Sequence, residues 1–256
     1  MSFFRKLYHA IYIALIFAYS MLEAAIQRPH TRAARATWLS RLCRRLMRSM
    51  NMTVTTIGPV PTHGAVISNH LSYTDILLHS AARPCVYVAK SELRHTPVLG
   101  WCSMMAGTVY VSRGSGGSAA AAGEQMAAGF RDGLPITFFP EGTTGVGDEP
   151  VMSFRSGLLA QSIAAGAPIT AAFVRYELAP IDVAAGKTVR DDVAWGAVSL
   201  PHHMANFFGL HTLHGTIEFA AQPIAFSEAA LTDRKLAAAE AREAVRALSD
   251  SDNSNA

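Results

Sequence analysis

The sequence predicts an α/β fold in which helices flank a mixed, mostly parallel sheet. Two observations lead to this class. From about residue 51, short apolar runs of strand length alternate with longer stretches that have a helical period. At 256 residues, the chain is long enough for one such domain and a smaller appendage. We therefore expect a helical arm over residues 1–50, the main domain over 51–248, and a polar, disordered tail over 249–256.

Seven runs in the main domain have the length and composition of strands. They lie near residues 52–57, 64–68, 85–89, 108–112, 135–139, 168–175 and 215–220. Helical stretches lie near residues 73–82, 118–131, 154–165 and 232–248. Strands that alternate with helices in this way are typical of a largely parallel sheet that is covered on its faces.

The arm differs from the rest of the chain in charge. Half of all residues are hydrophobic and only 16% are charged, which is an apolar composition for a freely soluble protein. The net charge of +3 conceals an arm in which Glu23 is the only acidic residue and seven arginines follow the first apolar stretch. A basic, apolar segment indicates anionic lipid as a partner rather than nucleic acid, because no aromatic-basic interleaving or zinc-finger spacing accompanies it.

The first apolar stretch leaves its relation to a membrane open. Residues 10–22 are uncharged, but this run of 13 falls short of the ~20 residues that cross a bilayer. We favour a helix that lies in the membrane interface. The alternatives are a single membrane span and a signal peptide with Ala18-Tyr19-Ser20 as its cleavage site.

The second half of the arm favours the interfacial reading. From Trp38 to Met50 the apolar residues follow a helical period, and the opposite face carries Arg41, Arg44, Arg45 and Arg48. We expect this basic amphipathic helix to lie among lipid headgroups. The alternative is an ordinary helix that packs on the main domain with its arginines in solvent.

A histidine and an aspartate follow the second strand-like run at a spacing that suits proton transfer. Residues 65–68 read as a buried strand, and residues 73–78 read as the start of a helix. With His70 in the turn and Asp75 in the first helical turn, the carboxylate reaches one imidazole nitrogen and leaves the other as a general base, with a hydroxyl as the obvious group to deprotonate. A capping or core role for His70 is the alternative, since this spacing is weak evidence alone.

A second string, Pro140-Glu141-Gly142-Thr143, supports a functional site. It follows the strand-like run of residues 134–139 directly. Ligands of open α/β sheets gather where strands end in tight turns. We therefore expect this turn and His70 to face the same site.

Four motifs in order resemble those of the glycerolipid acyltransferase family, which includes the 1-acylglycerol-3-phosphate acyltransferases. The resemblance covers about residues 60–220, with motifs at Asn69-His70-x4-Asp75, residues 107–113, residues 139–143 and residues 167–170. It implies that His70 is the base and Asp75 its partner. It also implies that Arg113, Glu141, Gly142 and Thr143 bind the acceptor, and that the two N-terminal helices are a membrane-docking arm.

One departure from the family pattern concerns the acceptor. Thr144-Gly145 stand where many lysophosphatidate-acylating members carry Arg-Ser. Arg155 or Lys90 would then supply the missing charge. The form of this region, together with residues 154–156 and 195–202, is similar to branches that acylate lyso-ornithine lipid or lysophospholipids.

The resemblance thus implies O-acyl transfer from a thioester donor, acyl-CoA or acyl carrier protein, to the hydroxyl of a lysolipid. The first choice of acceptor is 1-acylglycerol-3-phosphate, in phospholipid biosynthesis, and the alternative is lyso-ornithine lipid or another lysophospholipid. No cofactor or metal is expected. Because the donors are cytosolic, the expected location is the cytoplasmic face of the inner membrane. Rival readings are a non-catalytic lipid-binding protein on the same fold and hydrolysis of the thioester by water.

Other chemistry-bearing residues give no competing signal. Cys43, Cys85 and Cys102 read as buried free thiols in a reducing compartment. Gly186-Lys187-Thr188 lacks the first glycine and the strand context of a phosphate-binding loop. Four histidines near the C-terminal end lack the pattern of a metal site, and they are His202, His203, His211 and His214.

Overall fold

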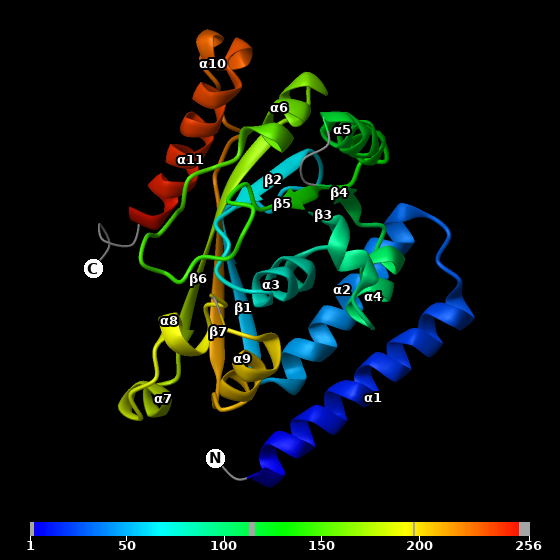
Figure 1. Cartoon of the computed structure of the whole chain (residues 1–256), viewed down its shortest axis with the longest axis vertical. Coiled ribbons are helices and arrows are strands. Elements are labelled where there is room, and N and C mark those ends of the chain that lie inside the picture. The colour runs from blue at the N-terminus through cyan, green and yellow to red at the C-terminus, as the bar shows by residue number, and fades with distance from the viewer. Residues whose placement is uncertain (1–2, 113–115, 197, 251–256) are drawn as a thin grey trace.

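The computed structural model describes residues 3–112, 116–196 and 198–250. Its centre is a seven-stranded sheet in the order β1-β7-β6-β2-β5-β3-β4 (Figure 1). The strands are β1 (Met52–Ile57), β2 (Ala65–Ser68), β3 (Val86–Lys90), β4 (Val109–Val111), β5 (Ile136–Phe138), β6 (Ile169–Leu178) and β7 (Leu213–Phe219). All neighbouring strands are parallel except β6 and β7, which are antiparallel. The predicted mixed, mostly parallel sheet is confirmed.

Helices cover both faces of the sheet. One face carries α5 (Gly116–Arg131), α6 (Ser156–Ala164) and α11 (Arg234–Asp250), and the other carries α3 (Thr74–Ala82) (Figure 1). Successive residues of a strand point to opposite faces. Ile67 of β2 therefore joins the core beneath α5, α6 and α11, and Val66 joins the core beneath α3. β2 is buried along its whole length, as expected of a central strand.

Several short helices were not expected. They are η1 (Ser91–His95), α4 (Leu99–Met105), α7 (Pro180–Ala184), α8 (Val189–Asp192), α9 (Leu200–Phe207) and α10 (Glu228–Thr232). The last helix also departs from the expectation of a tail that begins at residue 249. Ser249 and Asp250 still belong to α11, where the Ser249 hydroxyl donates to the Arg246 carbonyl. The tail prediction is wrong for these two residues, and residues 251–256 lie outside the described part.

The arm consists of two packed helices, α1 (Phe3–Gln27) and α2 (Arg32–Ser49), and α2 lies between α1 and α3. The Trp38 indole is fully buried and donates to the Ser20 carbonyl at 2.9 Å. Glu23 pairs with Arg41 at 2.8 Å and with Arg45 at 2.6 Å. These arginines hold the pKa of Glu23 below its usual value, with the Arg45 hydrogen bond as the largest cause.

The arginines of α2 lie on the face opposite its apolar residues, as predicted, but three of the four bind protein groups instead of standing free for lipid. Arg41 and Arg45 face α1 because the single acid of the arm lies there, and Arg44 donates to the Ala81 carbonyl at 2.8 Å. Leu42 and Leu46 on the opposite side are buried. α2 thus corresponds to the alternative of an ordinary helix packed on the domain.

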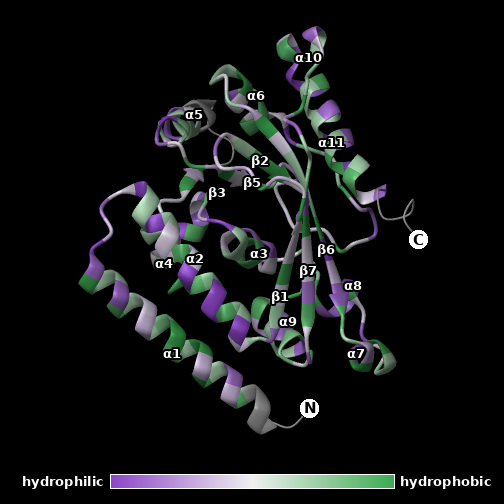
Figure 2. Ribbon diagram, turned by 180° about the vertical axis from the view of Figure 1, so that it is seen from behind, coloured by the Kyte–Doolittle hydropathy of each residue, from purple (hydrophilic) through white to green (hydrophobic). Residues whose placement is uncertain are grey.

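The apolar surface of the arm belongs to α1 instead. Exposed side chains recur every three or four residues along this helix, and Figure 2 shows α1 as the outermost element on this side of the molecule. They are Leu7, Tyr8, Ile11, Tyr12, Leu15, Tyr19, Leu22 and Ile26. We call this set the α1 stripe.

The expectation that the apolar run is too short to span a membrane is also wrong. The segment Leu7–Gln27 has 21 residues and a mean hydropathy of 1.6, with 17% of it buried. Its length and composition suffice to cross a bilayer, because the helix continues through Glu23. Buried core helices and signal sequences meet the same criterion of length and hydropathy.

Candidate active site

The predicted site residues gather at the edge of the sheet where the parallel strands end. His70 follows β2, Glu141 follows β5, and Lys90 is the last residue of β3. β2 lies between β5 and β6, so that the chain crosses from one side of β2 to the other when it passes from β5 to β6. Reversals of this kind open a crevice at the carboxyl ends of the strands. Arg113, which follows β4, lies outside the described residues.

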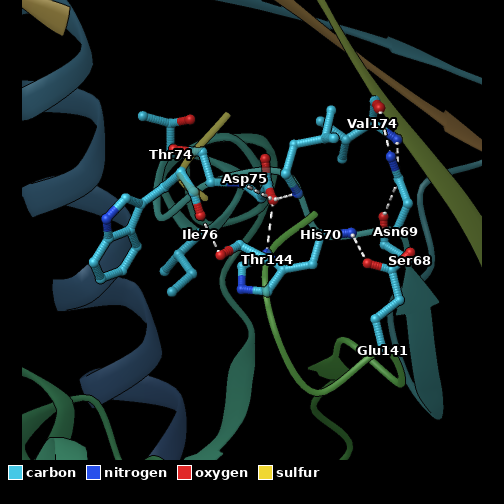
Figure 3. A network of polar contacts seen from close by, with 12 residues as sticks. Ser68, Asn69, His70, Thr74, Asp75, Ile76, Glu141, Thr144 and Val174 are labelled. Atoms are coloured by element: carbon cyan, nitrogen blue, oxygen red, sulfur yellow. Dashed lines mark hydrogen bonds and ion pairs between the residues drawn. The ribbon is translucent and has the colours of Figure 1, made fainter. Parts of the chain in front are cut away.

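His70 and Asp75 form a buried pair, as their spacing predicts. His70 lies in the turn before α3, and Asp75 lies in the first turn of that helix. The His70 Nδ1 is 2.8 Å from Asp75 Oδ2 (Figure 3). The carboxylate is fully buried and also accepts from the amides of Leu71 at 2.8 Å and Ser72 at 3.0 Å. One side chain therefore both orients the imidazole and builds the turn that carries it.

The second carboxylate oxygen of Asp75 has a partner that the sequence did not reveal. The Tyr176 hydroxyl of β6 donates to Asp75 Oδ1 at 2.5 Å. Burial, and then the charge of Asp75, raise the pKa of Tyr176 well above its usual value, so the phenol stays protonated. The available signal was a tyrosine in β6 that is buried between the charged residues Arg175 and Glu177.

Asn69 fixes the start of the same turn. Its side-chain amide donates to the Val174 carbonyl at 2.9 Å and accepts from the Val174 amide at 2.8 Å. The residue is 1% exposed. Because these two bonds imitate the pairing of a strand, β2 stays bound to β6 one residue beyond its end (Figure 3).

The ring of His70 is held in one plane. It stacks on Phe139 with ring centroids 3.9 Å apart and planes 9° apart. An ionised carboxylate only accepts hydrogen bonds, so Nδ1 carries the proton and Nε2 carries a lone pair. No described residue hydrogen-bonds Nε2, and the side chain is 16% exposed. Nε2 is therefore available to accept a proton from a bound molecule.

Glu141 joins the two loops of the site. Its Oε2 accepts from the His70 amide at 3.1 Å, and its Oε1 accepts from the Met152 amide at 3.0 Å. Burial raises the pKa of this carboxyl to about 7. These contacts position the backbone of His70, and contact of Glu141 with an acceptor stays a prediction.

The turn after Glu141 lies open to solvent with a cation beside it. Gly142 has a φ of 71°, and a Cβ there would be 2.6 Å from Arg155 Nε. Thr143 and Arg155 are exposed. No hydrogen bond or ion pair holds the Arg155 guanidinium among the described residues. The structure thus brings Arg155 to the Gly142–Thr143 turn, whereas Lys90 lies exposed at the end of β3.

The backbone amides that follow His70 are already engaged. Amides near the start of a helix such as α3 are candidate donors to an oxyanion. Those of Leu71 and Ser72 donate to Asp75, and that of His70 donates to Glu141. These three amides are therefore not free to serve as such donors, since the turn uses them to hold Asp75 and Glu141.

The other chemistry-bearing residues have separate surroundings. All three cysteines are buried and free, as predicted. His211 pairs with Asp182 at 2.9 Å, and His214 contacts Thr53 at 2.8 Å. His203 lies 3.3 Å from the Tyr73 hydroxyl. Among the described residues, no three metal-ligating side chains form a group that could hold an ion.

The fold and the site define an α/β protein in which a buried carboxylate orients a histidine at the carboxyl edge of a largely parallel sheet. Residues 51–175, which contain this site, match the acyltransferase family model. Residues 51–175, just under half of the chain, thus form an acyltransferase-family domain.

Several relatives of known function are similar to this chain. It is 32% identical over 156 residues to the lyso-ornithine lipid O-acyltransferase of Pseudomonas aeruginosa, covering 60% of this chain and 58% of that protein. It is 34% identical over 121 residues to the 1-acyl-sn-glycerol-3-phosphate acyltransferase of Neisseria gonorrhoeae, covering 46% and 47%. The chain thus matches about half the length of these curated relatives.

The fold is shared with a solved structure. The crystal structure of the 1-acyl-sn-glycerophosphate (LPA) acyltransferase PlsC from Thermotoga maritima superimposes with a TM-score of 0.62. The match covers 96% of this chain and 98% of that one, at 19% identity. The similarity therefore extends over both the sheet and the N-terminal helices.

Proposed function

We propose that this protein is an O-acyltransferase that moves a fatty acyl chain from a thioester donor to the hydroxyl of a lysolipid. The observation that carries the proposal is the His70–Asp75 pair, with Nδ1 held by the carboxylate and Nε2 open. The names of the relatives, which are acyltransferases of lysolipids, support the same reaction.

The proposed mechanism uses His70 twice. Nε2 takes the proton of the acceptor hydroxyl while its oxygen attacks the thioester carbonyl. The tetrahedral intermediate collapses by breaking the carbon–sulfur bond, and the imidazolium returns the proton to the departing thiolate. An ester and a free thiol result, with no acyl-enzyme and no cofactor. Asp75 keeps the tautomer fixed throughout, and the face of Phe139 favours the transient imidazolium.

We propose 1-acylglycerol-3-phosphate as the acceptor, with lyso-ornithine lipid or another lysophospholipid as the second candidate. A phosphate acceptor fits the exposed Arg155 at the Gly142–Thr143 turn, together with Arg113, Glu141 and Lys90 as further contacts. The second candidate is favoured by Thr144, whose hydroxyl donates to the Trp195 carbonyl and brings no charge. Relatives from Pseudomonas aeruginosa and Brucella abortus also bear the lyso-ornithine name, the latter at 29% identity over 72% of this chain.

A lysolipid panel tests the proposal. The full chain is incubated with labelled acyl-CoA or acyl carrier protein and with lysophosphatidate, lysophosphatidylcholine or lyso-ornithine lipid. We expect acceptor-dependent ester formation that His70→Ala abolishes. Thiol release that does not depend on lysolipid would indicate hydrolysis, and lipid binding without turnover would indicate the non-catalytic reading.

We further propose that the arm of residues 1–50 attaches the acyltransferase domain to the cytoplasmic face of a membrane, with the α1 stripe in the interface. A cavity of about 340 Å³ at the turn between α1 and α2 supports contact with anionic headgroups. Arg28, His30 and Arg35 line it beside Trp101 and Met105, and no acid contributes to its lining. Basic groups at the end of an apolar helix suit a phosphate-rich interface.

A further inference from the structure

Three segments that are far apart in the sequence meet directly behind His70. The Thr144 hydroxyl donates to the Trp195 carbonyl, and the Trp195 amide donates to the Leu71 carbonyl at 2.7 Å. The amide of Gly145 donates to the His70 carbonyl at 2.8 Å. We call the contacts of Thr144, Gly145 and Trp195 with one another and with the carbonyls of His70 and Leu71 the Trp195 clasp. It joins the turn after β2, the loop after β5 and the segment between α8 and α9.

The Trp195 segment is itself held firmly. The Trp195 ring packs edge-on against Tyr73 with centroids 5.7 Å apart, and its indole donates to the Val198 carbonyl at 3.0 Å. His203 anchors the other side, with Nε2 3.1 Å from the Val193 carbonyl and Nδ1 3.3 Å from the Tyr73 hydroxyl. Nε2–H therefore donates to the carbonyl, and Nδ1 accepts from the tyrosine. A fixed segment can hold the loop that it touches.

The clasp holds the C-terminal end of the exposed Gly142–Thr143 turn. The near end of this turn is fixed to His70 through the Phe139 ring and the Glu141 carboxylate. Its far end is fixed by Gly145 and by the Thr144 hydroxyl. The distance between Nε2 and anything bound at the turn therefore depends on all these contacts.

The segment that completes the clasp lies outside the region that matches the family model. That region ends at residue 175, whereas Trp195 lies between β6 and β7. The antiparallel pairing of these strands returns the intervening residues to the sheet edge that carries His70. Thr144 thus connects the shared catalytic region with a part of the chain that the model does not cover.

We propose that the Trp195 clasp is a specificity-determining element, in which Thr144 is a positioning residue that sets which acceptor head group fits at the Gly142–Thr143 turn. This inference rests on the proposed function. Thr144 acts through the turn and not on the reacting atoms, so it controls the binding of the acceptor more than the chemical step. The thioester donor does not depend on it.

Two substitutions at one position isolate the hydroxyl. Thr144→Val keeps the shape of the side chain and removes the hydrogen bond to the Trp195 carbonyl, and Thr144→Ser keeps the bond. The matched control is Thr55→Val at an exposed position of β1, away from the site. Hydrogen exchange of the Trp195 amide, which donates to Leu71, reports directly whether the clasp has opened.

The test measures kcat and KM of the full chain for lysophosphatidate, lyso-ornithine lipid and the donor. For Thr144→Val we expect the acceptor KM to rise about three- to tenfold, the size expected for one hydrogen bond. The rise should differ between the two acceptors, so that the ratio of their kcat/KM values changes at least threefold. Thr144→Ser and Thr55→Val should keep the wild-type ratio, and the donor KM should stay constant.

Three results would overturn the inference. An unchanged acceptor ratio in Thr144→Val, despite faster exchange of the Trp195 amide, would show that the clasp is structural only. A change confined to the donor KM would assign the turn to the other substrate. If Thr144→Val does not fold, Trp195→Leu provides the second variant, and an unchanged ratio there has the same meaning. Absence of transfer by the wild-type protein to any lysolipid would instead remove the proposed function, and the inference with it.

Discussion

At the scale of single residues, Asp75 is the centre of the site. It accepts hydrogen bonds from His70, Leu71, Ser72 and Tyr176, and it is fully buried. The His70 ring makes fewer contacts, because among the described residues it hydrogen-bonds Asp75 and stacks on Phe139. The two residues of the pair should therefore differ in what their loss does to the fold.

We expect His70→Ala and Asp75→Asn to lower kcat by similar factors and to differ in stability. Loss of a general base, or of the group that orients it, costs about 10²–10⁴-fold. In Asp75→Asn the new side-chain NH₂ group faces hydrogen-bond donors of the protein. Buried donors are then left unpaired, which lowers the free energy of unfolding by about 1–3 kcal/mol. Rates and thermal denaturation of both variants check this. A His70→Ala protein that keeps more than about a tenth of the wild-type rate would contradict the base assignment.

Tyr176→Phe should weaken the site without abolishing it. The substitution removes the donor to Asp75 Oδ1 and keeps the ring in its core. One lost hydrogen bond to a charged group corresponds to about 1.5–3 kcal/mol, so a fall in kcat/KM of up to about a hundredfold is expected. The control is Thr55→Val at an exposed position of β1, away from the site, which should keep wild-type activity. Equal activities of the two variants would remove Tyr176 from the site.

Glu141 should make stability depend on pH near neutrality. Its pKa is raised by burial to about 7 from the usual 4.5, so the folded protein binds more protons than the unfolded chain between these values. The stabilisation is complete below about pH 4.5 and is lost as the pH rises through 7. Each pKa unit corresponds to about 1.4 kcal/mol. Glu141→Gln should flatten the dependence of Tm on pH between 5 and 8, and an unchanged slope would refute the shift.

At the scale of elements, the sequence predicts what depends on local pattern. The seven strands lie close to the expected ranges because each is a short apolar run, and the long helices have a clear period. α7 and α8 were not predicted, because helices of four or five residues are too short to show a helical period in the sequence. The partner of the arginine-rich face of α2 could not be predicted, because the sequence pattern is the same whether that face binds lipid or Glu23 on another helix.

The candidate site was likewise predictable only where its contacts are local in the sequence. His70 and Asp75 are five positions apart, so local spacing sufficed to pair them. Tyr176 reaches Asp75 across 101 positions, and Trp195 reaches Thr144 across 51. Such contacts follow from the order of the strands and from the antiparallel pairing of β6 and β7, which no local pattern encodes. The strand order also decides which loops share an edge.

The packing of the arm gives a prediction about truncation. α2 contributes Trp38, Leu42 and Leu46 to a core shared with β3 and α4. A protein that lacks residues 1–50 should therefore expose this core and aggregate. A protein that lacks residues 1–29 removes α1 and keeps α2, so it should stay folded and soluble. Size-exclusion chromatography and circular dichroism of the two proteins distinguish these outcomes, and a monomeric, folded protein without residues 1–50 would contradict the role of α2.

At the scale of the whole molecule, the packing of the arm bears on the proposed attachment to a membrane. α1 is tied to α2 by the Trp38–Ser20 hydrogen bond and by Glu23 with its two arginines. A helix that crosses the bilayer alone would have to leave these partners behind. A helix that lies along the interface keeps them and presents the α1 stripe to lipid. The packed arm therefore favours, within the proposed membrane attachment, a helix that stays on one side of the bilayer.

Substitution of the α1 stripe should release the protein from membranes and leave its chemistry intact. Burial of one leucine or isoleucine contributes about 1.5–3 kcal/mol, so Ile11→Gln, Leu15→Gln and Leu22→Gln together should lower binding to vesicles by far more than tenfold. The control is Leu231→Gln at an exposed position of α10, on a different part of the molecule. Sedimentation with vesicles measures binding, and transfer to dispersed lysolipid measures the site itself. Wild-type vesicle binding by the triple variant would contradict the role of the stripe. A tag ahead of Met1 that is protected from protease on the side of the catalytic domain would show that α1 leaves α2 and crosses the bilayer.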